Sequence, residues 1–387
     1  MPILRLIAEG VGPFESLDID FSDGNGKPHL GPHILAGVNG SGKSTVLRTI
    51  AWVLDRGALG FQYEDWQESL GEFSHALLAM DSLGLKVQAV CKFRMFQDLP
   101  AALEEWVRAS LPSAWTARMG KMEALNRPGG FYASWMPSPF EWYDLLAAYS
   151  SSRALRHLAS PDLTKRLESP YQNSLGFEST VRNDFVQSWL LGLYSKMAIA
   201  RERKEPSSDY SRLLALFERA LSRLFGEEVV FDVEIEPAFQ PRLKVRGKRL
   251  NFSQLPDGMR STIAWISDFM MRQEMMKWNP ELKGKHPGVL LLDEVDAHLH
   301  PLWQRHFLPA MREALPDVQI IVTSHSPFVI SSCQGARVHV LETDDRGHAH
   351  AHPPIDSPFG ESVTATLKDI FGVDSRFDIT TEAELND

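Results

Sequence analysis

Hydrophobic and polar residues alternate at the start of the chain, around residues 85–96 and again from Val229 to Ile235. This period of two predicts β-strands with one buried and one wet face. A Gly12-Pro13 turn separates the first two strands, so a hairpin is expected there. A short apolar strand at residues 33–36 then runs into a glycine-rich turn, and the apolar residues of 44–54 recur at helical spacing.

The middle of the chain, residues 98–225, is expected to be mainly helical, and its last helix carries an apolar stripe that ends at Gly226. Two continuous apolar runs, 289–292 and 320–322, predict buried parallel strands. We therefore expect an α/β fold with a mixed central sheet, an antiparallel β subdomain and a helical insertion. The predicted lobes are 1–97 with the glycine-rich turn, the insertion 98–225, and 226–387.

Composition narrows the class of protein. The chain has 387 residues, 40 basic and 50 acidic, and a net charge of −10, which excludes a bare basic nucleic-acid-binding module. Its two cysteines cannot form a disulfide framework, which favours a reducing compartment. Neither a signal peptide nor an apolar run of roughly 18 residues is found, so we expect a cytoplasmic protein without a membrane partner.

The strongest motif is the glycine-rich turn Gly37–Thr45, with the sequence GVNGSGKST. It follows a predicted strand and precedes a predicted helix, which is the context that a phosphate-binding loop requires. Its backbone N–H groups and the helix N-terminus would hold phosphates. Lys43 would reach the β- and γ-phosphates of ATP, and the Ser44 hydroxyl would ligate Mg²⁺.

A second motif complements this loop, because Asp293 and Glu294 directly follow the apolar strand 289–292. Ligands of parallel sheets bind at the carboxyl ends of the strands. Asp293 is expected to hold Mg²⁺, and Glu294 is expected to polarise the attacking water.

Two weaker motifs lie on either side of this acidic strand. His325 ends the strand that begins near Ile320, where an imidazole can bind the γ-phosphate and hold the water. The segment Leu255–Arg260, with Gly258, precedes a helix whose N-terminus can present amides to a phosphate.

These four motifs, in this order, resemble those of the RecF/SMC/OLD-like branch of the ABC ATPases. The run from Asp293 to Pro301 is similar to the "DE…LHP" run of OLD-like proteins, and Phe14–Leu17 and Thr323–Pro327 also look like that branch. The resemblance frames residues 1–60 and 250–335 and implies an ABC-type P-loop ATPase head. It further implies a homodimer or higher oligomer in which ATP lies between two heads, and the segment 255–260 of one head completes the site of the other.

The motifs and the resemblance together define the predicted site. The catalytic residues are Glu294 and His325, and the metal ligands are Ser44 and Asp293. The nucleotide-binding residues are Asn39, Gly40, Ser41, Gly42, Lys43, Ser44, Thr45, Pro256, Asp257, Gly258, Arg260 and Asp296. The cofactors are ATP and Mg²⁺.

The chain departs from the family in two places. Pro256 stands where the family has a serine hydroxyl, and Asp257 stands at the first glycine, so slow hydrolysis or an altered dimer geometry is expected. The family's glutamine loop corresponds either to Gln97 or, as we favour, to the end of the strand 145–149 with residues 150–153.

The resemblance implies an ATP hydrolase that controls a nucleic-acid-directed effector. Sixty residues follow Pro327, too few for the nuclease domain of OLD proteins, so a nuclease or toxin effector in trans is expected. Short ATPases of this kind look like the ATPase subunits of bacterial anti-phage systems such as Septu or PARIS. The alternatives are a RecF-type DNA-repair ATPase, an ATP-bound scaffold with slow turnover and, less favoured, a transporter ATPase subunit.

Two further patterns, one of cations and one of histidines, lie outside the predicted site. Residues 242–249 carry five cations, which would suit either a DNA or RNA backbone or an ordinary solvated hairpin. His348, His350 and His352 alternate along a predicted strand, but no fourth ligand is evident, so a zinc site is not favoured.

Overall fold

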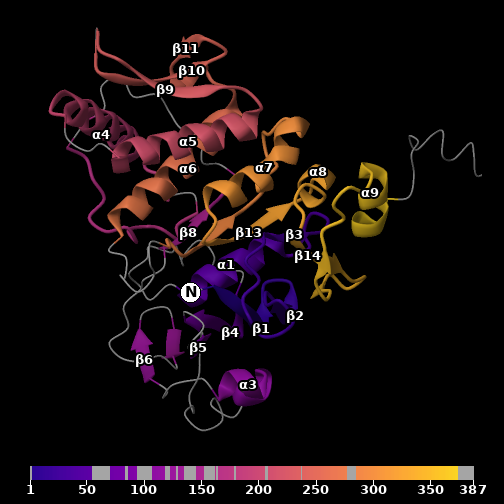
Figure 1. Ribbon diagram of the computed structural model, residues 1–387. Coiled ribbons are helices and arrows are strands. Elements are labelled where there is room, and N and C mark those ends of the chain that lie inside the picture. Colours follow the sequence, from indigo (N-terminus) through magenta and orange to yellow (C-terminus); the bar gives the residue numbers. More distant parts are fainter. Residues whose placement is uncertain are drawn as a thin grey trace, which may run out of the picture.

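The computed structural model describes most of the chain. The described residues are 2–54, 70–82, 86–93, 107–117, 123–127, 130–134, 145–151, 162, 164–177, 180–204, 208–236, 238–276 and 285–373. The molecule is layered, with helices on one side of a central sheet and a second, antiparallel sheet on the other (Figure 1).

The central sheet has the order β15-β14-β3-β13-β12-β8, and β16 pairs with β14. Five neighbouring strands, from β14 to β8, run parallel, and β15 and β16 are antiparallel to β14. The strands are β3 (His33–Ala36), β8 (Leu145–Tyr149), β12 (Gly288–Leu292), β13 (Val318–Ser324), β14 (Arg337–Thr343), β15 (Ala349–Ala351) and β16 (Ile355–Asp356).

The second sheet is antiparallel and has the order β2-β1-β4-β5-β7-β6. Its strands are β1 (Ile3–Val11), β2 (Phe14–Asp20), β4 (Leu70–Ser82), β5 (Lys86–Phe93), β6 (Glu123–Arg127) and β7 (Gly130–Ser134). A third, three-stranded sheet has the order β11-β10-β9 and consists of β9 (Val229–Glu234), β10 (Gln240–Val245) and β11 (Lys248–Leu250).

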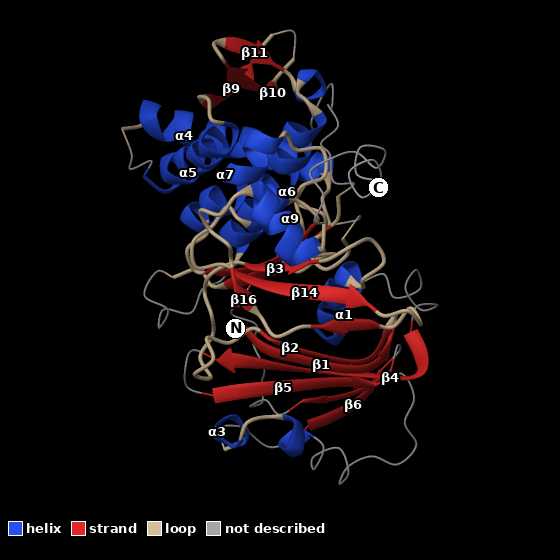
Figure 2. Ribbon diagram, turned by 90° about the vertical axis from the view of Figure 1, so that its right-hand side faces the viewer, coloured by secondary structure: helices blue, strands red, loops and turns tan. Residues whose placement is uncertain are grey.

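Helices cover the sheets as the apolar patterns require. They are α1 (Lys43–Leu54), α3 (Ser113–Thr116), α4 (Asn183–Glu202), α5 (Ser208–Phe225), α6 (Asp257–Met275), α7 (Pro301–Ala314), α8 (Pro327–Ile330) and α9 (Val363–Phe371), with a 3₁₀ turn η2 (Phe252–Gln254) before α6. Figure 2 shows α1 between the central and the antiparallel sheet, and α4 to α7 on the opposite face of the central sheet. Of the helices in the described ranges, none combines the length and apolar character needed to cross a bilayer.

Alternate residues of the central strands face two separate cores, because successive side chains of a strand point to opposite faces. Leu290 and Leu292 of β12 belong to the core beneath α4 to α7. Val289 and Leu291 belong to the core that includes α1 and the antiparallel sheet. Both faces are therefore covered, which is why this strand reads as a continuous apolar run.

The predicted fold class, a mixed central sheet with an antiparallel β subdomain, is confirmed by this topology. The predicted hairpin is β1–β2. The predicted strands before the glycine-rich turn, before the acidic pair and before His325 are β3, β12 and β13, and the predicted helix after the turn is α1. The described residues of 98–225 include the two long helices α4 and α5, but they also include three strands. Two of these, β6 and β7, extend the antiparallel sheet, and β8 is an edge of the central sheet. The division into three lobes stays a prediction.

Candidate nucleotide-binding site

The glycine-rich loop joins β3 to α1, and two of its glycines permit close backbone packing. Gly37 has a φ of 152°, and a Cβ at this position would lie 2.2 Å from the Leu341 carbonyl oxygen. Gly42 has a φ of 86°, and a Cβ there would lie 2.5 Å from the Phe14 ring. Asn39 and Gly40 are exposed at the tip of the loop. The loop is thus packed against β14 and β2 at its ends and open in its middle.

Lys43 is 5% exposed, and its side chain lies inside the loop. Its Nζ donates to the carbonyl oxygens of Gly37 at 3.0 Å and Val38 at 2.8 Å, and it lies 3.5 Å from Ser41 Oγ. Burial lowers the pKa of Lys43 to about 8, although nearby carboxylates, Asp293 first, act in the opposite direction. The ammonium therefore lies where phosphate oxygens would arrive.

Asp293 connects this loop to the acidic strand. It follows β12 and is 6% exposed. Its Oδ1 accepts from Ser44 Oγ at 2.9 Å and from Thr323 Oγ1 at 2.6 Å. The structure thus brings together Ser44 and Asp293, the two residues predicted to ligate a metal. Their hydroxyl and carboxylate oxygens are the donor type that Mg²⁺ prefers.

Glu294 lies beside Asp293 with its side chain exposed. Its φ is 48°, in the left-handed region that non-glycine residues seldom adopt. Its backbone N–H donates to Thr323 Oγ1 at 2.7 Å. Within the described ranges, the Glu294 carboxylate has neither an ion-pair nor a hydrogen-bond partner. It is therefore available to accept a proton from a water molecule.

His325 lies directly after β13, near Lys43 and Glu294. Burial lowers the pKa of the imidazole, and the charge of Lys43 lowers it further, against the opposing effects of Asp296, Glu294 and the Gly37 backbone. The His325 backbone N–H donates to Asp296 Oδ1 at 3.4 Å. The neutral ring is thus favoured, and one of its nitrogens can donate a hydrogen bond.

The segment 255–260 packs against the residues that follow Glu294 in the chain. Pro256 is the N-cap of α6, and Asp257 forms an ion pair with Arg260. A Cβ on Gly258 would lie 2.3 Å from the His298 carbonyl oxygen. This close approach fixes the start of α6 against the residues that follow Glu294. Among the described residues, no hydrogen bond or ion pair joins 256–260 to the phosphate loop of the same chain.

Two residues that were not predicted from the sequence, Thr323 and Gln304, connect parts of this site by hydrogen bonds. Thr323 bridges Asp293 and the Glu294 backbone, as described above. Gln304 of α7 donates to the Asp296 carbonyl at 3.1 Å and the Leu299 carbonyl at 2.9 Å, and it accepts from Ser326 Oγ at 2.6 Å. Thr323 begins the Thr323–Pro327 motif and stands two residues before His325, whereas nothing in the sequence singles out Gln304.

The favoured equivalent of the glutamine loop begins at the end of β8, which lies beside β12, the strand that leads to Asp293. β8 pairs in parallel with β12, and the Tyr149 carbonyl accepts from the Asp293 N–H at 2.9 Å. Of the residues considered for this role, Gln97, Ser152 and Arg153 lie outside the described residues.

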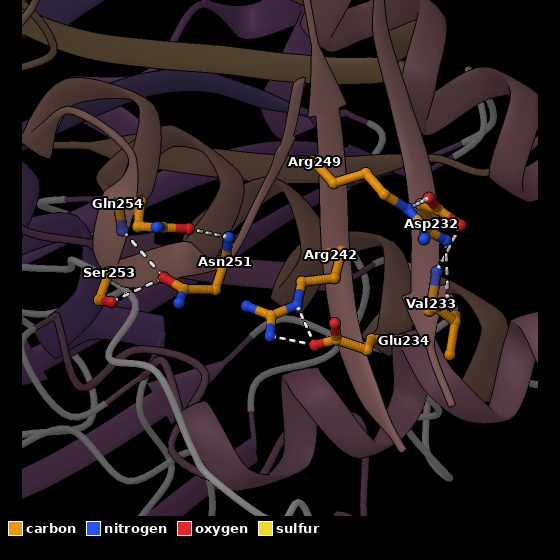
Figure 3. Close-up of polar contacts among 8 residues, drawn as sticks. All are labelled: Asp232, Val233, Glu234, Arg242, Arg249, Asn251, Ser253 and Gln254. Atoms are coloured by element: carbon orange, nitrogen blue, oxygen red, sulfur yellow. Dashed lines mark hydrogen bonds and ion pairs between the residues drawn. The ribbon is translucent and has the colours of Figure 1, made fainter. Parts of the chain in front are cut away.

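The basic run 242–249 is largely neutralised (Figure 3). Arg242 is paired with Glu234, and Arg249 with Asp232, across the strands of the third sheet. Arg246 is paired with Glu227. Residues 227–250 contain five acidic and five basic side chains. This hairpin therefore lacks the excess of unpaired cations that a nucleic-acid backbone attracts.

The alternating histidines also lie beside carboxylates. His352 is 2.9 Å from Glu342, and His348 and His350 lie 3.8 and 3.5 Å from Asp344. No group of three or more ligands in the described part of the chain has the arrangement needed to hold a metal ion.

Comparison with known proteins identifies the class of protein. The model of the AAA_21 family, described as "AAA domain, putative AbiEii toxin, Type IV TA system", matches residues 133–331, about half of the chain. The chain belongs to this family of ATPase domains. The match includes the segment 255–260, the acidic strand and His325, and the phosphate loop precedes it.

Individual proteins are similar to this chain over shorter segments. A segment of 128 residues is 33% identical to the Septu protein PtuA of Bacillus thuringiensis and covers 32% of each chain. A segment of 124 residues is 30% identical to the "Retron Vc95 probable ATPase" of Vibrio cholerae, over 31% of this chain and 23% of that protein. The Septu protein PtuA of Bacillus mycoides is 28% identical over 153 residues, which are 40% of this chain and 21% of that protein. The matches thus span a third or less of these relatives.

The solved structures to which this chain is similar include head domains of SMC proteins. The SMC head domain of Thermotoga maritima aligns over 91% of this chain and 99% of its own, with a TM-score of 0.47 and 16% identity. An Smc head bound to the C-winged helix domain of ScpA aligns over 92% and 98%, with a TM-score of 0.49 and 13% identity.

Proposed function

We propose that this protein is a Mg-ATP-dependent ABC-type ATPase that dimerises on ATP and controls an effector supplied by another chain in bacterial anti-phage defence. The observation that carries the proposal is the set of contacts at Asp293. One carboxylate oxygen accepts hydrogen bonds from Ser44, at the start of α1, and from Thr323, at the end of β13. These contacts join the phosphate loop, the acidic strand and the strand that leads to His325.

Nucleotide binding is assigned to the phosphate loop. The exposed tip at Asn39 and Gly40 offers backbone N–H groups, and the start of α1 adds its positive end. Lys43 would exchange its bonds to the Gly37 and Val38 carbonyls for phosphate oxygens. Because burial has lowered its pKa, an arriving phosphate restores the fully charged ammonium and is held by it.

Ser44 and Asp293 are the residues that would hold Mg²⁺, since both present oxygen donors at one point. When bound, the ion neutralises charge on the phosphate oxygens. The exposed Glu294 carboxylate would orient a water molecule and accept its proton. His325, kept neutral by burial and by Lys43, would donate a hydrogen bond to the γ-phosphate. Asp296 fixes the backbone of His325 in this position.

Dimerisation is assigned to the segment Pro256–Arg260, which would meet the γ-phosphate of a second copy. It is supported by the position of this segment in the described part of the chain, where neither a hydrogen bond nor an ion pair joins it to the phosphate loop of the same chain. Pro256 has no hydroxyl to donate, so the backbone N–H groups near Gly258 remain, together with Arg260. Arg260 is already paired with Asp257. We therefore infer slow turnover, and an ATP-bound scaffold that barely hydrolyses is the second candidate function.

The role in defence rests on the relatives named Septu PtuA and retron ATPase. The chain would hold or release a nuclease or toxin, and opening of the dimer on hydrolysis would provide the switch. The ion pairs of the third sheet argue against nucleic-acid contact through residues 242–249. DNA-stimulated turnover would favour the RecF-type alternative and would exclude the static scaffold.

ATP binding tests the first step. Lys43→Ala should abolish ATP binding in isothermal titration, and Lys196→Ala is a matched control because Lys196 is exposed on α4 and pairs with Glu274. Unchanged ATP affinity in Lys43→Ala would refute the role of the loop. Affinity purification from the native host should recover a nuclease or toxin, and recovery of recombination proteins instead would favour the repair function.

A further inference from the structure

A fully buried polar cluster joins the second half of α6 to the end of β8, the strand that pairs with β12. It consists of Tyr149, Asp268 and Arg272, which we call the buried triad, and each of its side chains is 0% exposed. Tyr149 is the last residue of β8, and Asp268 and Arg272 are one turn apart on α6. Buried charges of this kind are rare unless they are paired and hydrogen-bonded.

The triad meets this condition. Tyr149 OH donates to Asp268 Oδ2 at 2.8 Å, and Arg272 Nε donates to the same oxygen at 2.6 Å. The remaining Arg272 N–H groups donate to the carbonyls of Pro170 and Gln172, both at 2.8 Å, and of Thr180 at 3.0 Å, with a longer contact of 3.5 Å to Asp268. All five guanidinium donors therefore have acceptors. Burial raises the pKa of Tyr149 well above its usual value, so its hydroxyl remains a donor.

Stability alone does not explain such a cluster. Apolar residues of similar volume often replace a buried ion pair without loss of stability. The triad differs from apolar packing because each of its hydrogen bonds requires a defined geometry and a defined partner. It thus sets the position of α6 relative to β8 and to residues 170–180.

Those partners lead to the nucleotide site by two routes. In the first, the Tyr149 carbonyl accepts from the Asp293 N–H at 2.9 Å, so the residue that anchors α6 also holds the acidic strand end. In the second, Thr180 Oγ1 donates to the Ala148 carbonyl at 2.7 Å, and the nearby Phe177 ring lies 5.1 Å from the Arg48 guanidinium of α1. Both the acidic strand and the helix after the phosphate loop are thereby connected to α6.

The other end of α6 carries the segment Pro256–Arg260. Gly258 is packed against His298, four residues beyond Glu294. Helix α6 is therefore held at its start by the contact of Gly258 with His298 and in its second half by the triad. Loss of the triad would leave the phosphate loop intact and would free α6 to shift.

We propose that Tyr149, Asp268 and Arg272 are positioning residues that transmit the state of the nucleotide site to the dimerisation segment Pro256–Arg260. This rests on the proposed function, because it assumes that the segment meets the ATP of a second copy. ATP binding to one head does not depend on the triad, whereas pairing of two heads on ATP does.

Tyr149→Phe tests this with minimal change, since it removes one hydroxyl and leaves the ion pair. Tyr194→Phe on α4 is the matched control, because its hydroxyl has no hydrogen bond to any of the described residues. Each change would be made in the wild-type chain for turnover and in Glu294→Gln for ATP-induced dimerisation, which light scattering measures. A second variant, Asp268→Leu with Arg272→Met, replaces the ion pair by apolar groups.

In Tyr149→Phe we expect dimerisation and kcat to fall roughly tenfold, the effect of one hydrogen bond to a charged group, with the ATP dissociation constant within about twofold of wild type. The apolar double variant should remain folded with similar ATP affinity and lose ATP-induced dimerisation. Wild-type dimerisation in a folded double variant, or equal effects of Tyr149→Phe and Tyr194→Phe, would overturn the inference. Failure of the wild-type chain to bind ATP would instead overturn the proposed function on which it rests.

Discussion

The Thr323 hydroxyl makes two hydrogen bonds at the centre of the candidate site, and its removal is the sharpest structural perturbation available. It donates to Asp293 Oδ1 at 2.6 Å and accepts from the Glu294 N–H at 2.7 Å. Thr323→Val keeps the shape of the side chain, so the buried position gains no cavity. Only the two bonds are lost, and the buried Asp293 carboxylate keeps Ser44 as a donor.

The expected cost follows from the kinds of bond. A hydrogen bond to a charged group contributes about 1.5–3 kcal/mol, and one between neutral groups about 0.5–1.5 kcal/mol, so the two together give about 2–4.5 kcal/mol. Groups that orient a metal-binding carboxylate commonly change activity by about 10- to 100-fold. We therefore expect kcat for Mg-ATP to fall by about 10- to 100-fold in Thr323→Val, with the melting temperature lowered by several degrees.

The assay is phosphate release at saturating Mg-ATP, at a temperature where thermal melts show each variant to be folded. Thr323→Ser is the control, because it keeps the hydroxyl and loses only a methyl group. It should retain turnover within about threefold of wild type, since its hydrogen bonds remain. Turnover of folded Thr323→Val within about twofold of wild type would refute the positioning role of this hydroxyl.

Three further predictions concern other parts of the molecule. His33 and His339 are buried and 3.1 Å apart, and burial lowers the pKa of His33 well below its usual range and that of His339 to about 3. The unfolded chain therefore binds more protons below the usual pKa, so the free energy of unfolding should fall between pH 7 and pH 5, by about 2 kcal/mol for His339, with His33 acting in the same direction. Urea unfolding should show a shallower pH dependence in His339→Leu, and an unchanged slope would contradict this. Gly258→Ala should disturb the contact with His298 and reduce ATP-induced dimerisation more than ATP affinity, as gel filtration and titration would show; equal losses in both would point to misfolding. Gln304→Leu removes the hydrogen bonds of Gln304 to the Asp296 and Leu299 carbonyls and to Ser326 Oγ. It should lower kcat by about tenfold at unchanged ATP affinity. An unaltered kcat would exclude a positioning role of Gln304 in the candidate site.

The parts of the site that the sequence predicts are those encoded by short local patterns. Gly37–Thr45 and the run ending in Asp293 and Glu294 each combine a strand with the polar residues at its end. Parallel strands bring such ends to one edge of a sheet, and the contact of Ser44 with Asp293 agrees with this expectation. The roles of these residues in catalysis remain predictions.

The parts that the sequence does not predict depend on contacts between distant segments. Asp268 and Arg272 were not singled out in the sequence, and only the packing of β8 and residues 170–180 against α6 shows that they are buried. Arg242 and Arg249 read as part of a basic surface, and only the register of β10 against β9 and β11 brings acidic partners to them. The strands β6 and β7 lie in a segment without clear alternation, where pairing with the antiparallel sheet determines the structure.

The central claim is that the residues around Asp293 form an ATP-hydrolysing site in which Glu294 activates water. The most direct test is to measure phosphate release and retained nucleotide in the wild-type chain and in Glu294→Gln, with the exposed Glu228→Gln as control. We predict slow Mg-ATP turnover in the wild-type and control chains. Glu294→Gln should release no phosphate and elute from gel filtration as a dimer with intact ATP. Full turnover in Glu294→Gln would contradict the account.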